Sequence, residues 1–112
     1  MHAVGDPSLL SGLHHLPQDA TRSATLPDGS QLPIIGVGTI QMNGFNIPDV
    51  YLVDGVTVNL ISVGRLATNH NISCCFYSNR CRLVMLGDGT RVGEAVLDDD
   101  GVYGLRFLQV PA

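Results

Sequence analysis

Two Asp-Gly pairs, each followed by a hydroxyl residue, have the residue types of a catalytic carboxylate loop. They are Asp28-Gly29-Ser30 and Asp88-Gly89-Thr90. Carboxylates that are held close together push their pKa values apart, so that one can act as an acid and the other as a base. Asp-Gly is also favoured in hairpin turns for backbone reasons alone, and both pairs fall where a turn is expected. We therefore interpret both as turns and expect no catalytic residue there.

A second group of reactive side chains consists of one histidine and the three cysteines of the chain, and its members are His70, Cys74, Cys75 and Cys81. These residue types can bind zinc, but no Cys-x-x-Cys pair is present. Neighbouring residues of a strand point to opposite faces, so Cys74 and Cys75 cannot both easily face one metal ion. No general-base partner for a cysteine nucleophile is identifiable. The sequence thus predicts no metal site and no cysteine enzyme, and the adjacent cysteines favour reduced thiols over disulfides.

Two further polar clusters have residue types found in cation sites. Asp98, Asp99 and Asp100 are consecutive, and His14 adjoins His15. Successive carboxylates without further ligand spacing are typical of a solvated turn rather than of a calcium loop. The two histidines fall on the surface or at the end of a predicted helix. We expect neither cluster to bind a metal ion, and the sequence predicts no cofactor.

The first element that must position these side chains is a predicted helical segment over residues 1–21. Asp6 before Pro7 has the residue types of a helix N-cap and a first helical position. Apolar residues then recur at helical spacing until Pro17 ends the run. These residues are Leu9, Leu10, Leu13 and Leu16.

From Arg22 onward the pattern changes to short strands separated by turn residues. Turn signals occur at Pro27-Asp28-Gly29, Asn43-Gly44, Asp54-Gly55, Ser78-Asn79, Gly87-Asp88-Gly89 and Asp98–Gly101. Strands are predicted between them at residues 23–26, 32–37, 39–42, 45–47, 50–53, 72–77, 80–85 and 90–97. In the final strand Tyr103, Leu105 and Phe107 are expected to share one face. Short strands at a spacing of about 8–12 residues predict a single domain over residues 1–112, all-β and mainly antiparallel, with a small barrel at 22–110 and one or two short helices.

One stretch in the middle of the chain predicts a strand that gives way to a helix. The residues Asn59, Leu60 and Ile61 continue an apolar extended run that begins at Val58. Ser62 and the spacing of Val63 and Leu66 then predict one helical turn packed back onto a sheet. We regard residues 59–66 as the structural anchor of the chain.

The charge balance excludes several kinds of partner. The net charge is −4, the pI is about 5.3, and the six basic residues are all arginines that never form a run. Affinity for a phosphate backbone comes mainly from positive charge, so we expect no nucleic-acid partner. No lysine is present for a Schiff base. No apolar stretch approaches the ~20 residues that span a bilayer, and the N-terminal residues lack a signal-peptide profile, so a soluble protein of the cytoplasm or nucleus is expected.

Several short motifs follow one another along essentially the whole chain. They are His2 with Gly5-Asp6-Pro7-Ser8-Leu9-Leu10, Leu26-Pro27-Asp28-Gly29-Ser30 with Gly36-Val37-Gly38-Thr39-Ile40, Val50-Tyr51-Leu52-Val53, Asn59-Leu60-Ile61-Ser62-Val63-Gly64-Arg65-Leu66, Phe76 with Cys81, and Val102-Tyr103. In types and order they resemble the aspartic-protease-like β-barrel segment of copia-type retrotransposon polyproteins, which occur widely in plants.

The resemblance implies roles for several of these residues. Asp28, Gly29, Ser30, Gly36 and Gly38 would belong to a flap-like hairpin, which covers the substrate in that family, and Cys81 would pack in the core. A retropepsin-like ancestry also implies a two-fold dimer, with contacts from the C-terminal strand at Tyr103, Leu105 and Phe107.

One departure from the family decides the functional expectation. The family's Asp-Ser-Gly-Ala motif lies a few residues before the histidine that corresponds to His2, and this sequence begins at Met1. A retropepsin-like enzyme needs one such Asp from each of two subunits. We therefore expect a retrotransposon-derived, catalytically inactive domain that binds a host protein, by strand addition to an exposed edge or by pairing with a protease-like relative.

Two alternatives belong to other functional classes. The chain would be an active homodimeric aspartic protease if a displaced carboxylate such as Asp6 entered the dimer interface. It would be a single-stranded nucleic-acid-binding barrel if one face offered a stacking platform, but the few aromatic residues and the acidic pI count against this.

Overall fold

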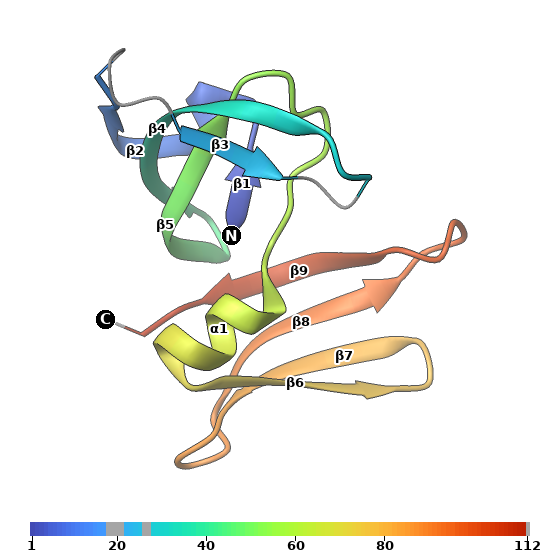
Figure 1. Cartoon of the computed structure of the whole chain (residues 1–112). Coiled ribbons are helices and arrows are strands. Elements are labelled where there is room, and N and C mark those ends of the chain that lie inside the picture. The colour runs from blue at the N-terminus through green and yellow to red at the C-terminus, as the bar shows by residue number, and fades with distance from the viewer. Residues whose placement is uncertain (18–21, 26–27, 112) are drawn as a thin grey trace. The chain divides into compact units, whose positions relative to one another are not determined.

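Figure 1 shows the computed structural model, which describes residues 1–17, 22–25 and 28–111. Strands make up most of the described chain, and most strand pairs are antiparallel. This confirms the predicted all-β class with short helices. The residues gather in two compact units, the first of Met1–Gln41 and Pro48–Ile61 and the second of Met42–Ile47 and Ser62–Ala112. The single domain and the small barrel stay predictions.

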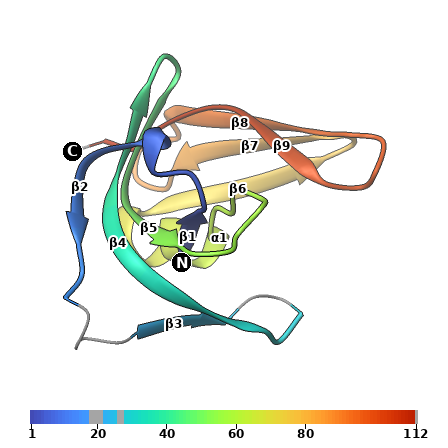
Figure 2. The same cartoon turned by 90° about the horizontal axis from the view of Figure 1, so that it is seen from above.

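The first unit is built around the long strand β4 (Gln31–Met42). The strands β2 (Leu10–His15) and β3 (Arg22–Thr25) both pair with β4 in antiparallel register (Figure 2), and β5 (Phe45–Val53) lies on its other side. The strand β1 (His2–Val4) pairs in parallel with the end of β5, and Ala3 exchanges two backbone hydrogen bonds of 2.8 Å with Leu60. The core of this unit contains Ala3, Ala24, Ile34 and Val53, with Leu16, Leu32, Tyr51 and Val56 packed against it.

The helix predicted over residues 1–21 is wrong in its greater part. Asp6 does cap a helix with Pro7 at its first position, but this is a 3-10 turn of three residues, Pro7–Leu9. The following residues form β2, whose pairing with β4 shifts register between Ser11 and His14, where Gly12 has a φ of +60°. An extra residue in a strand puts side chains three apart on one face, which explains the helix-like spacing of Leu10 and Leu13. Residues 18–21 lie outside the described part of the chain.

The strands of the first half are longer than their sequence pattern predicts. The pieces expected at 32–37 and 39–42 are one strand of 12 residues, and those at 45–47 and 50–53 are one strand of nine. The Asn43-Gly44 turn that joins the two strands is confirmed, with a φ of +84° at Gly44. The interruption expected between residues 47 and 50 remains visible as a φ of +56° at Asp49, although β5 continues to Val53.

The second unit is a meander of four strands that follow one another in the sheet (Figure 1). They are β6 (Ile72–Tyr77), β7 (Arg80–Met85), β8 (Arg91–Leu97) and β9 (Tyr103–Gln109), and each is antiparallel to the next. Phe45 and Asn46, at the start of β5, pair in parallel with β9. The predicted strands at 72–77 and 80–85 and the turn at Ser78-Asn79 are confirmed. Buried side chains of this unit include Ile47, Leu66, Ile72, Cys81, Leu83, Val92, Ala95, Leu108 and Val110.

The helix α1 (Val63–His70) begins where the sequence predicts it. The Ser62 side chain accepts a hydrogen bond of 3.2 Å from the Arg65 N–H, and Leu66 is completely buried. The helix runs for eight residues rather than one turn, because no Gly or Pro interrupts it after Gly64. It ends at His70 and is capped by Asn71, which adopts the left-handed conformation that closes many helices. The next residue starts β6, so α1 lies next to that strand.

A bulge in the last strand pair overturns the predicted common face of Tyr103, Leu105 and Phe107. Leu105 lies opposite Ala95, but Phe107 lies opposite Glu94, the neighbouring residue of β8. Because neighbouring strand residues point to opposite faces, Phe107 lies on the other side of the sheet from Leu105. Leu108 takes the buried position instead, opposite Gly93. A Cβ at Gly93 would lie 2.9 Å from the Phe107 carbonyl oxygen and 3.0 Å from Leu108 Cδ1, so this contact depends on glycine.

The cap of α1 gives a first testable prediction. Replacing Ser62 with Ala leaves the Arg65 N–H without its side-chain acceptor, and the free energy of unfolding is expected to fall by about 1 kcal/mol. Urea denaturation followed by circular dichroism measures this change. Ser62→Asp is the matched control because it keeps a side-chain acceptor, and a loss as large in Ser62→Asp as in Ser62→Ala would contradict the capping role.

Candidate functional site

The two Asp-Gly pairs that have the residue types of a catalytic loop both form turns. The Asp28 carboxylate accepts hydrogen bonds from the backbone N–H (2.9 Å) and the hydroxyl (2.6 Å) of Ser30. The Asp88 carboxylate accepts one of 3.0 Å from the Thr90 N–H. These bonds lower the pKa of both carboxyl groups from the ordinary value of 3.8. Asp6 is held in the same way by Ser8, through its hydroxyl and its N–H, and its pKa is lowered for that reason.

The acidic run also forms a turn, as predicted. Asp98 accepts a hydrogen bond of 3.0 Å from the Val102 N–H and shares another with Asp100. The bond with Asp100 and the bond from Val102 lower the pKa of Asp98, whereas the hydrogen bond and the negative charge of Asp98 raise the pKa of Asp100. Over residues 1–17, 22–25 and 28–111, no group of three or more His, Cys, Asp and Glu side chains is arranged to hold a metal ion.

These carboxylates predict how stability responds to acid. The folded pKa values of Asp6, Asp28 and Asp88 are lowered, so their contribution to stability is present above pH 3.8 and is lost as the pH falls through the folded values. The raised pKa of Asp100 acts in the opposite sense. Urea midpoints measured between about pH 5 and pH 2 should therefore fall. The fall should be smaller in Asp28→Asn, which keeps a side-chain acceptor but does not titrate. An equal fall in the variant would contradict this role for Asp28.

The residues assigned to a flap-like hairpin do not form one cluster. Asp28, Gly29 and Ser30 lie in the loop between β3 and β4, where Gly29 has a φ of +87°. Gly36 and Gly38 lie within β4 and face β2. A Cβ at Gly36 would lie 2.9 Å from Leu13 Cδ1, and one at Gly38 would lie 3.1 Å from Leu10 Cβ. The two glycines therefore allow the leucines of β2 to approach β4 closely, while Asp28, Gly29 and Ser30 are exposed.

The three thiols are divided between the two faces of the β6–β7 hairpin. Cys74 lies opposite Leu83 and Cys81 opposite Phe76, so both point to the buried face, while Cys75 points to the other. Burial, together with the nearby Cys81 and Cys75 thiols, raises the pKa of Cys74 to about 11. Burial also raises the pKa of Cys81, whose thiol donates to the Arg82 carbonyl oxygen at 3.9 Å. Cys75 is exposed.

This arrangement predicts an order of alkylation. Iodoacetamide at about pH 8 should modify Cys75 before the other two thiols, because only a thiolate that solvent can reach reacts quickly. Peptide mass spectrometry over a time course measures the three rates. The order should vanish when the chain is labelled in urea, and labelling of Cys81 as fast as Cys75 in the folded chain would contradict the described register.

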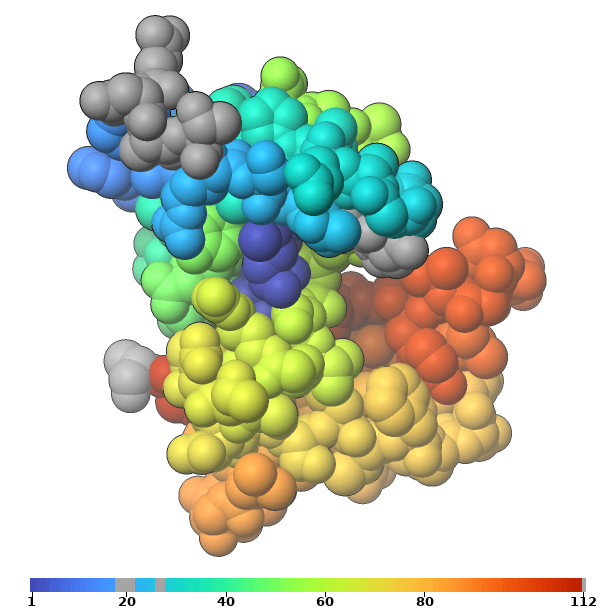
Figure 3. Space-filling view, viewed as in Figure 1, coloured from blue at the N-terminus to red at the C-terminus, as the bar shows by residue number. Residues whose placement is uncertain are grey.

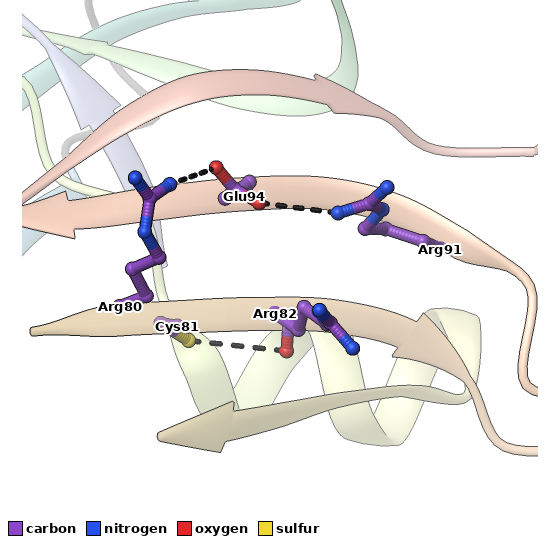
Figure 4. A network of polar contacts seen from close by, with 5 residues as sticks. All are labelled: Arg80, Cys81, Arg82, Arg91 and Glu94. Atoms are coloured by element: carbon purple, nitrogen blue, oxygen red, sulfur yellow. Dashed lines mark hydrogen bonds and ion pairs between the residues drawn. The ribbon is translucent and has the colours of Figure 1, made fainter. Parts of the chain in front are cut away.

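The face of the sheet on which Cys75 lies carries three arginines and one carboxylate. The Glu94 carboxylate forms two ion pairs, one through each oxygen (Figure 4). Arg80 Nη1 lies 2.7 Å from Oε1, and Arg91 Nη1 lies 3.2 Å from Oε2. Arg82 lies opposite Cys75 and places its guanidinium carbon 5.2 Å from the centre of the Tyr77 ring. Two of these arginines thus share one carboxylate, while Arg82 stacks on an aromatic ring. Because this group has three arginines and one carboxylate, its net charge is positive.

The outer edge of β6 is the open edge of the second unit. In the described part of the chain β6 pairs only with β7, and Cys75, Phe76 and Tyr77 are exposed. Figure 3 shows the β6–β7 hairpin, in gold, at the surface of the molecule. The strand contains no charged residue and no Pro, which are the usual protections of an edge.

The hydrogen-bond alternation identifies which backbone groups this edge offers. The Asn71 carbonyl accepts from the Leu86 N–H at 2.8 Å, and Tyr77 pairs with Arg80 across a two-residue turn. Every second residue between Asn71 and Tyr77 therefore forms its backbone hydrogen bonds with β7. The intervening Cys74 and Phe76 direct their N–H and C=O groups away from β7. The Asn79 carbonyl, which accepts from the Leu97 N–H at 2.8 Å, fits the same alternation on β7.

An aromatic pair lies on the opposite face, at the end of the hairpins. The Phe76 and Tyr103 rings meet edge to face, with centres 5.1 Å apart and planes at 73°. Phe76 remains 57% exposed and the neighbouring Val102 55% exposed, so the pair is only partly covered. Of the three residues proposed as a dimer contact, Tyr103 and Leu105 lie on this face and Phe107 does not.

The sequence does not predict that Phe76, Tyr77, Arg82 and Glu94 lie near one another. The alternation of Arg80 and Arg82 with apolar residues was visible, but the partner of each arginine depends on the register of three strands. The uncharged run Ile72–Tyr77 was a signal that could have pointed to this edge.

No protein-family model, curated protein or solved structure matches this chain. Among the described residues, no helix is both long and apolar enough to cross a membrane.

Proposed function

We propose that this chain is a retrotransposon-derived, catalytically inactive protease-like domain that binds a host protein inside the cell. The motifs that resemble the copia-type segment support the ancestry. The inactivity is supported by the hydrogen bonds of Asp28 and Asp88, which hold both carboxylates in exposed turns.

The observation that carries the binding role is the open edge of β6. Its Cys74 and Phe76 present backbone donors and acceptors that β7 does not use, on a strand without charge or Pro. Such an edge is a template for an extended segment of another protein, which would add as a further strand. Backbone hydrogen bonds would supply the affinity, and side chains on the two faces the specificity.

Affinity capture with two matched variants tests this role. Phe76→Pro removes an N–H that does not bond to β7, so the hairpin should be retained while the edge is blocked. Phe76→Ala removes the same side chain but keeps the N–H. We expect a partner, identified by mass spectrometry from native tissue, to be held by the wild type and by Phe76→Ala, and to be lost from Phe76→Pro.

Two controls make the capture decisive. Circular dichroism and the urea midpoint must show that Phe76→Pro is folded, and Cys75→Pro, which removes an N–H directed at β7, should be clearly less stable. A partner held equally by Phe76→Pro would overturn the edge as the binding site. Pepstatin-sensitive cleavage of peptides at mildly acidic pH would overturn the inactive-protease interpretation.

A further inference from the structure

The two faces of the β6 edge differ in chemistry. This difference indicates which side chains a segment added there would carry on each face. On one face Phe76 lies beside Cys81 and against Tyr103, an apolar and aromatic surface. On the other face Tyr77 and Cys75 are exposed, and the Arg82 guanidinium lies over the Tyr77 ring. A strand added to β6 would run about 4.8 Å away, with its side chains alternating between these two surfaces.

Arg82 is the charged group that such a strand would meet. Arg80 and Arg91 both bind Glu94, whereas among the described residues no carboxylate is paired with Arg82. The aromatic ring below its guanidinium leaves the N–H donors at the rim able to bind an anion.

From this geometry, and resting on the proposed function, we infer that the segment added to β6 alternates acidic and apolar residues. A carboxylate lies beside Tyr77, where it binds the Arg82 guanidinium, and an apolar side chain lies beside Phe76. A second copy of this chain fits the edge less well, because β6 contains no carboxylate and self-pairing would place two Arg82 side chains on the same face without an anion.

Three synthetic peptides of nine residues test the inference directly. Each alternates Val with Glu, Gln or Lys, and carries a fluorophore for anisotropy titration against the whole chain. We expect the Glu peptide to bind about tenfold more tightly than the Gln peptide, because a hydrogen bond to a charged group is stronger than a neutral one. The Lys peptide should bind more weakly than the Gln peptide.

Two arginine variants distinguish the contribution of Arg82 to the peptide preference from that of the general positive charge of the face. Arg82→Gln should reduce the preference for Glu over Gln to less than about threefold, as expected once the charge-assisted bond is lost. The preference should persist in Arg91→Gln, because Arg91 is already paired with Glu94. Salt should weaken binding of the Glu peptide and leave the Gln peptide nearly unchanged.

The outcomes distinguish this inference from the proposed function. If Phe76→Pro weakens all peptides but Glu and Gln bind equally, the carboxylate inference is overturned and edge binding stands. If no peptide binds, the inference is overturned, and the capture experiment decides the edge separately. A dimer of the wild-type chain that Phe76→Pro converts to a monomer in sedimentation would also overturn it, in favour of a second copy.

Discussion

The register of the β6–β7 hairpin determines most of the chemistry of the second unit. Its two-residue turn pairs Tyr77 with Arg80, and every later pair follows from that one. The same alternation separates Cys75 from Cys74 and Cys81, sends Arg82 to the face of Tyr77, and turns the backbone of Phe76 outward. A slip of one residue would reverse all of these assignments together, so all of them depend on the same register.

The sequence predicted best the features that depend on few neighbouring residues. Turn chemistry at Asn43-Gly44 and Ser78-Asn79 and the cap at Ser62 were visible because glycine conformation and side-chain acceptors act over two or three residues. The strands Ile72–Tyr77 and Arg80–Met85 followed from simple alternation. Each of these signals is local, and no distant contact reverses it.

The errors arose where a bulge changed the side-chain period. Leu10 and Leu13 have a helical spacing, but pairing with β4 and one extra residue at Gly12 produce the same common face in a strand. At the other end of the chain the bulge near Arg106 moves Phe107 off the face of Leu105. A bulge is specified by the partner strand, so a single-strand pattern does not reveal it. For the same reason the link between Arg80 and Glu94, 14 residues apart, could not be read from the sequence.

The pairing of β1 has a consequence for the order in which the chain folds. The meander β6–β9 joins neighbours in sequence, so its contacts close short loops and cost little entropy. His2–Val4 instead pair with residues 50–52, and Ala3 also bonds to Leu60. During synthesis these residues leave the ribosome before the rest of the first unit, yet their partners follow only after most of that unit has been made. The N-terminal strand is therefore the part of the first unit that waits longest unpaired, although its side chains end among the most buried.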